Sequence, residues 1–95
     1  MFEEIEIDSR VNKRHPELLK SDVSSAWQNA MIVIERSGGS LPNAILVAVG
    51  ADSKNRLIEM VGAVKDDGVE HIFHAMTPPS QKTLQEIGLI GRLSK

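Results

Sequence analysis

The stretch RLIEMVGAVKDDGVEHIFHAM, residues 56–76, decides the fold, because it predicts two β-strands joined by a tight turn. Asp-Gly between runs of alternating apolar residues favours a hairpin, since a two-residue turn needs positive φ at its central positions. With 67–68 as the loop, Lys65 pairs with Glu70, and the opposite charges of this cross-strand pair favour the register. The sequence therefore predicts a β-hairpin with a defined pairing of its strands.

The two faces of this predicted hairpin differ in polarity, because side chains alternate along a strand. We expect the first face to point to the core: Ile58, Met60, Gly62, Val64, Val69, His71, Phe73 and Ala75. The second face is mixed: Leu57, Glu59, Val61, Ala63, Lys65, Glu70, Ile72, His74 and Met76. On this second face, Glu59 and His74 are diagonal neighbours on the two strands. A shift by one residue would exchange the faces, so this pair depends on the turn.

The composition predicts one soluble domain over residues 1–95, long enough to bury roughly two thirds of its unfolded surface. The chain has no cysteine, which excludes a disulfide scaffold and a thiolate zinc site. The N-terminus lacks the layout of a signal peptide, and no apolar run approaches membrane-spanning length. We therefore expect a cytoplasmic protein with no membrane partner.

Charge and aromatic content limit any contact with nucleic acid. The net charge of −2 provides no basic stripe along which phosphates could be neutralised. The aromatic residues are Phe2, Trp27 and Phe73, too few for a reader that works by stacking on successive bases. A contact with RNA or DNA would therefore have to be local.

The whole chain predicts an α+β fold in the order β-α-α-β-β-β-β-α, with a small antiparallel sheet of roughly four to five strands. We expect the four central strands to be antiparallel and the helices to lie largely on one face. The elements predicted outside the hairpin are an edge strand over 2–7, a short helix that Asp8 or Ser9 caps and that runs through Arg14, a helix over 22–30, strands over 31–35 and 44–50, and a helix over 81–87 that Gly88 ends.

The last seven residues, 89–95, form a tail of the single domain. Leu89, Ile90 and Leu93 are large apolar residues with no evident partner in so small a core. Two placements stay open: the tail covers the mixed face of the sheet, or it docks on another chain, a second copy in a homodimer included.

Glu59 and His74 are the first candidates for chemistry. On an open sheet, a glutamate beside a histidine can orient the imidazole, which then acts as a general base. The alternative is an exposed salt bridge on a half-polar face, which composition alone favours.

A basic patch closes the first predicted helix, where Arg10, Lys13, Arg14 and His15 form the densest positive charge in the chain. The patch can bind a phosphate and supply a titratable imidazole. The alternative is a solvated helix end whose cations are well placed near the helix C-terminus. Arg56, which directly follows the turn predicted at residues 52–55, is likewise either an anion clamp or a solubilising charge at a strand end.

The sequence predicts no metal site and no cofactor. His71 and His74 are three residues apart on a strand and point to opposite faces, and no third ligand has a suitable spacing. The glycines near residues 37–43 do not follow a phosphate-loop pattern.

Three segments together resemble the BrnT-type toxins of bacterial type II toxin-antitoxin modules, which belong to the RelE-like ribonuclease fold group. The first, residues 13–16 with the helix at 21–30, is similar to that family's Lys-His-Gly segment and the helix after it. The second, residues 48–57, is similar to its Val-Gly strand, turn and Gly-Arg strand start, with Asn55 in place of glycine. The third, residues 72–80, stands where the family has an Ile-Ser-Ala-Arg strand end and a helix.

The resemblance implies a metal-independent endoribonuclease on a small antiparallel sheet, neutralised by a DNA-binding antitoxin. Such enzymes activate a ribose 2′-OH to attack the adjacent phosphate of RNA. By position, the resemblance assigns the phosphate to Arg56 with Arg14 or Lys13, and the proton transfers to His15 or His74 with Glu59 as orienter.

One departure from the family pattern keeps a second function open. Met76 stands where the family carries an arginine, so one expected phosphate-binding charge is missing. The alternative is a non-catalytic module for protein-protein interaction, a degenerate toxin relative. In that module, Glu59 and His74 are a surface pair, and the mixed face of the hairpin binds a protein partner together with the apolar tail.

Overall fold

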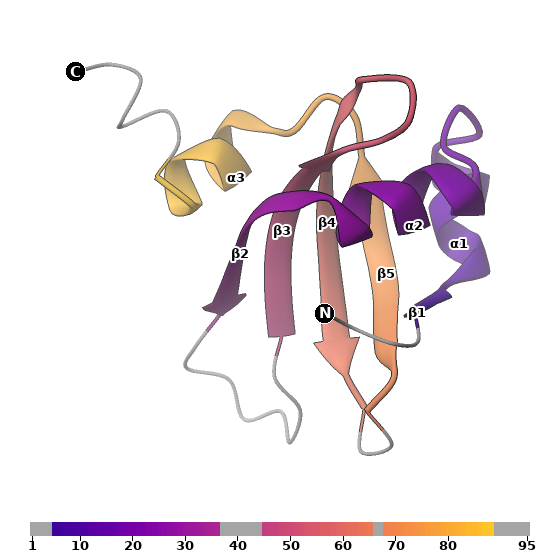
Figure 1. Ribbon diagram of the computed structural model, residues 1–95, viewed down its shortest axis with the longest axis horizontal. Helices are drawn as coiled ribbons and strands as arrows, with labels where there is room; N and C mark the ends of the chain where they lie inside the picture. Colours follow the sequence, from indigo (N-terminus) through magenta and orange to yellow (C-terminus); the bar gives the residue numbers. More distant parts are fainter. Residues whose placement is uncertain (1–4, 37–44, 66–67, 89–95) are drawn as a thin grey trace.

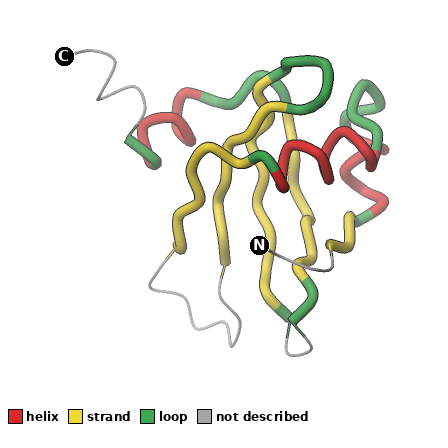
Figure 2. The backbone as a smooth tube through the Cα atoms, in the orientation of Figure 1, coloured by secondary structure: helices red, strands yellow, loops and turns green. Residues whose placement is uncertain are grey.

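The computed structural model describes residues 5–36, 45–65 and 68–88, and these form an α+β domain. Its elements are β1 Ile5–Ile7, α1 Ser9–Arg14, α2 Lys20–Gln28, β2 Ala30–Arg36, β3 Ile45–Ala51, β4 Leu57–Val64, β5 Glu70–Met76 and α3 Gln81–Glu86. Figure 2 shows how loops connect these helices and strands. The α+β class and the order of elements are confirmed, whereas the tail at 89–95 lies outside the described residues.

The sheet has five strands in the order β1-β5-β4-β3-β2. β2, β3, β4 and β5 pair with one another in antiparallel fashion, as predicted. β1 is an edge strand, also as predicted, but it pairs with β5 in parallel, so the sheet is mixed. The prediction of a small antiparallel sheet therefore holds for the four central strands and is wrong at the β1 edge, because two helices separate β1 from β2 and no hairpin sets the direction of β1.

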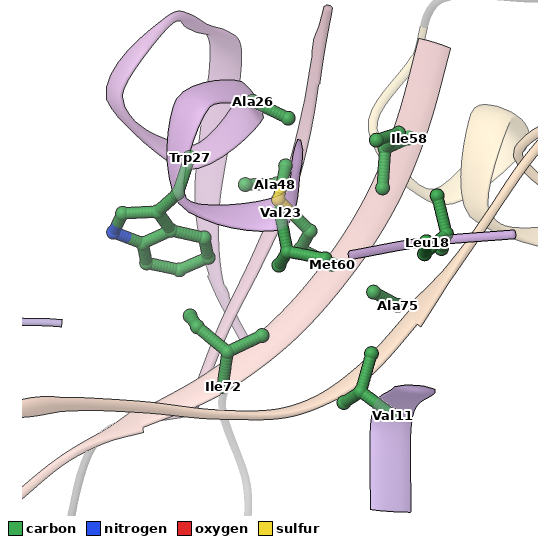
Figure 3. Packing of buried hydrophobic residues seen from close by; sticks show 10 residues of the cluster. All are labelled: Val11, Leu18, Val23, Ala26, Trp27, Ala48, Ile58, Met60, Ile72 and Ala75. Atoms are coloured by element: carbon green, nitrogen blue, oxygen red, sulfur yellow. The ribbon is translucent and has the colours of Figure 1, made fainter. Parts of the chain in front are cut away.

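The helices lie on both faces of the sheet, which corrects the prediction that they lie largely on one. In Figure 1, α2 crosses the strands, α1 lies on the β5 side of the view and α3 on the β2 side. The larger core packs α1 and α2 on one face: Val11, Leu18, Val23, Ala26, Trp27, Ala48, Ile58, Met60, Ile72 and Ala75 (Figure 3). Leu84 and Ile87 near α3 pack on the other face, against Val47, Val49 and Val61.

β3 explains why both faces need a cover. Val47 and Val49 point to one side and Ala48 to the other, and all three are fully buried. A strand that is apolar on both sides cannot leave either face to water without exposing a hydrophobic row. α3 therefore covers the face that α1 and α2 leave open.

The loop of the central hairpin is one residue longer than predicted. Gly68 has φ +83°, and its N–H donates to the Lys65 carbonyl at 2.9 Å. The Lys65 N–H donates to the Val69 carbonyl at 2.9 Å, so Lys65 lies opposite Val69, and Glu70 pairs with Val64. The predicted Lys65–Glu70 pair is wrong, because glycine occupies the left-handed position at the end of a three-residue loop.

An irregularity in β5 then restores the predicted register. Val61 pairs with His74 but Gly62 pairs with Ile72, so Phe73 is an extra residue in a β-bulge. The face assignments for Glu59, Val61 and His74 are therefore confirmed. The predicted face assignments are wrong for the β5 residues between the loop and the bulge. Glu70 and Ile72 lie on the α2 face, whereas Phe73 packs on the α3 face.

Candidate functional site

Glu59 and His74 meet on the α3 face of the sheet. The Nε2–H of His74 donates to Oε2 of Glu59 across 2.7 Å. The contact is a diagonal between neighbouring strands, because His74 pairs with Val61, two residues beyond Glu59 on β4. An ionised carboxylate only accepts hydrogen bonds, so in the neutral imidazole this contact keeps the hydrogen on Nε2 and leaves the lone pair on Nδ1.

Ser80 at the start of α3 holds the other oxygen of Glu59. Oε1 accepts the Ser80 N–H at 2.8 Å and the Ser80 hydroxyl at 2.9 Å. Glu59 is only 4% exposed, and this burial by itself raises the pKa of its carboxyl group. The hydrogen bonds from Ser80 and His74 outweigh burial and keep the pKa below its ordinary value, so Glu59 is an anion at neutral pH.

A pocket of about 430 Å³ opens over this pair. Its apolar surface comes from Val61 and Phe73, and the His74 side chain is 33% exposed. Besides Glu59 of β4, the charged side chains that line it come from α1, β2 and α3: Arg10, Arg14, Arg36, Lys82 and Glu86. In a chain of net charge −2, four cations around one pocket concentrate positive charge there.

Two of the four cations are already paired with carboxylates. Arg10 binds both oxygens of Asp8 at 3.0 Å. Arg36 binds both oxygens of Glu86 at 2.9 and 3.0 Å. The pKa of Arg36 is raised, first by its hydrogen bonds to Glu86 and also by the charge of Glu59, which places Arg36 within electrostatic reach of the Glu59–His74 pair.

The other two cations, Arg14 and Lys82, form no hydrogen bond or ion pair with any side chain that the structure describes. They come from different helices, α1 and α3, and line the same pocket. They are therefore the side chains with donors available for an anion.

The predicted basic patch is divided by the structure. Arg14 and Arg10 line the pocket, whereas Lys13 and His15 do not. Lys13 is exposed in the last turn of α1. His15 ends that helix, and its Nδ1 lies 3.7 Å from Glu17.

Arg56 also lies outside the pocket, in a separate ion-pair network. Its guanidinium donates to Asp52 at 2.9 Å, to Asp22 at 3.0 Å and to the Glu17 carbonyl at 3.1 Å. Lys54 adds a contact to Asp22 at 3.1 Å. Because both aspartates are buried, this network holds the turn between β3 and β4 against the start of α2.

Sequence reasoning missed Ser80, Arg36, Lys82 and Glu86 as site residues. Ser80 and Lys82 stood in a predicted helix start, and Arg36 at a predicted strand end, so each had an ordinary structural explanation. The position of α3 on the second face brings Ser80, Lys82 and Glu86 to the pocket, where Glu86 binds Arg36 of β2. A signal existed in β3, whose two apolar faces require a cover on each side.

No family model, curated protein or solved structure matches this chain. The relation to BrnT-type toxins therefore stays a prediction from sequence pattern. Among the described residues, no three histidine, aspartate or glutamate side chains gather closely enough to hold a metal ion. Within the same residues, no helix is long and apolar enough to cross a bilayer.

Proposed function

We propose that this protein is a BrnT-like toxin, a metal-independent endoribonuclease that acts in the bacterial cytoplasm and is neutralised by a DNA-binding antitoxin. The observation that carries the proposal is the pairing of His74 with buried Glu59 in a pocket lined by four cations. Cleavage of RNA by its own 2′-OH needs a positioned base and positive charge beside the phosphate. This pocket has both.

In the proposed reaction, Nδ1 of His74 takes the proton of the ribose 2′-OH. The 2′-oxygen then bonds to phosphorus, the bond to the 5′-oxygen breaks, and the products are a 2′,3′-cyclic phosphate and a 5′-hydroxyl. Arg14 and Lys82 stabilise the charge that develops on the phosphate. Lys82 lines the pocket with an ammonium group, and we assign it the proton for the leaving 5′-oxygen.

The charge missing at Met76 does not leave this pocket neutral. Arg14 and Lys82 have donors available, and Arg36 adds a third cation near Glu59. We therefore place the phosphate site between α1 and α3 and no longer at Lys13 or Arg56.

The test is cleavage of a labelled single-stranded RNA by purified protein in the presence of EDTA, with the ends of the products identified. His74→Gln should lower the rate by about 10²- to 10⁴-fold. Glu59→Gln should also lower it, because its amide keeps the two Ser80 hydrogen bonds but turns an N–H toward His74. That contact places the imidazole hydrogen on Nδ1, the atom that must act as base.

His15→Gln is the matched control, because it removes an imidazole that lies outside the pocket, and we expect it to leave the rate unchanged. Expression of the wild type should arrest growth and degrade RNA in the same cultures. Soluble wild-type protein that leaves RNA intact and growth normal would overturn the proposal. The non-catalytic interaction module would then be the function to pursue.

A further inference from the structure

The ion pair between Arg36 and Glu86 is placed where it can exchange partners. Arg36 ends β2 and Glu86 ends α3, and their side chains are 46% and 27% exposed. Exposed ion pairs contribute little to stability, because water and salt compete with them. α3 also has other attachments: Ser80 on Glu59, and the apolar contacts of Leu84 and Ile87 with the sheet. Loss of the pair would therefore leave α3 in place.

The second paired arginine of the pocket is held differently. Asp8, the partner of Arg10, caps α1 by accepting the Arg10 N–H at 2.9 Å and also lies 3.2 Å from Nε2 of His71. Asp8 is part of a local structure that joins β1, α1 and β5. Of the two paired arginines, Arg36 is therefore the one that can be released.

The contact itself has the geometry of phosphate recognition. Arg36 donates from Nε and Nη2 to the two carboxylate oxygens of Glu86, a bidentate arrangement that a phosphate group accepts equally well. Glu86 thus occupies the donors of a guanidinium that lines the pocket and lies near the Glu59–His74 pair.

We propose that Glu86 is an internal competitor for Arg36, and that a second phosphate of single-stranded RNA, next to the one that is cleaved, displaces it. The inference rests on the proposed function for the identity of the ligand. Arg14 and Lys82 hold the phosphate that is attacked, and Arg36 holds its neighbour on the β2 side. Glu86 lowers the affinity for isolated anions, so the pocket favours a chain with consecutive phosphates.

The experiment measures binding of a short 2′-O-methyl RNA, which cannot be cleaved, by isothermal titration at several salt concentrations. Glu86→Gln should tighten binding about three- to tenfold. Glu35→Gln is the matched control, because it makes the same change of net charge at an exposed residue beside Arg36 that does not line the pocket. We expect Glu35→Gln to leave the affinity unchanged.

Arg36→Gln tests whether the tighter binding of Glu86→Gln depends on Arg36. It should weaken binding and reduce the slope of log affinity against log salt by about 0.7, the value for one lost phosphate contact on a single strand. In the double variant with Glu86→Gln, the gain in affinity should disappear. A gain that survives in the double variant, or one that Glu35→Gln matches, would overturn the inference.

Cleavage and binding separate this inference from the proposed function. Wild-type protein that cleaves RNA, with Glu86→Gln binding no tighter than Glu35→Gln, would remove the inference alone. If the wild type never cleaves RNA, but its affinity for RNA changes in the Glu86→Gln and Arg36→Gln variants as expected, only the proposed ribonuclease activity is overturned. Wild-type protein that does not bind the RNA at all would remove the inference.

Discussion

Glu59→Gln should destabilise the fold moderately at neutral pH. Glu59 is buried and accepts hydrogen bonds from His74, the Ser80 N–H and the Ser80 hydroxyl at 2.7 to 2.9 Å. Glutamine keeps acceptors for Ser80, but a neutral acceptor binds more weakly than a carboxylate. The variant also avoids the cost of burying a charge. The net loss should be about 1–2 kcal/mol in the free energy of unfolding.

The loss should depend on pH in a defined direction. Burial raises the pKa of Glu59, but its hydrogen bonds lower it further, so the folded pKa lies below the unfolded value. Such a group stabilises the fold above the unfolded pKa, about 4.3, and this contribution disappears as the pH falls through the folded pKa. Glutamine does not titrate. The difference between wild type and variant should therefore shrink as the pH falls below about 4.

Urea unfolding followed by circular dichroism at pH 7 and at stepwise lower pH measures both effects. Glu35→Gln, an exposed change of the same type on β2, should match the wild type throughout. A loss for Glu59→Gln that stays constant down to the lowest pH would refute the reasoning, since it would mean that the charge of Glu59 does not stabilise the fold.

Two further substitutions test the packing of α2 and the ion-pair network. Gly50→Ala should lower the free energy of unfolding, measured in urea, by at least about 3 kcal/mol. The added Cβ would lie 2.1 Å from the carbonyl oxygen of Ala26, a backbone atom, so no movement of a side chain can relieve the clash. Near-wild-type stability would contradict the close approach of α2 to β3. Arg56→Met should lower the urea midpoint at least about twice as much as Lys54→Met, because Arg56 pairs with both buried aspartates, Asp22 and Asp52, whereas Lys54 pairs with Asp22 alone among the described residues. Equal midpoints would return Arg56 to the candidates for anion binding.

The elements themselves were predictable because their signals are local. Asp8 caps α1 as expected, Asn55 has φ 63°, and Gly88 follows the last helix with φ 83°. Helix capping, the tolerance of asparagine and glycine for left-handed backbone conformations, and apolar periodicity each depend on a few neighbouring residues. A short segment of sequence is therefore enough to recognise them. The α+β order follows from these signals.

The Glu59–His74 contact was predicted from a two-residue hairpin loop, but the loop in the structure has three residues. The bulge at Phe73 compensates for the extra residue, so Val61 still pairs with His74. The sequence between the loop and the bulge contains no signal for this compensation. Burial of Ile72 against the α2 face decides it, because that contact needs the tertiary core.

By itself, the sequence determined the order of the elements, the hairpin and the two residues at the centre of the candidate site, through short-range geometry and alternation. Tertiary structure decided which charges surround them. Arg56 was drawn into a buried network with Asp22, while Arg36 and Lys82, from distant parts of the chain, reached the pocket. The physical reason is that α3 crosses to the second face of the sheet, where it covers apolar side chains that no local pattern assigns to a partner.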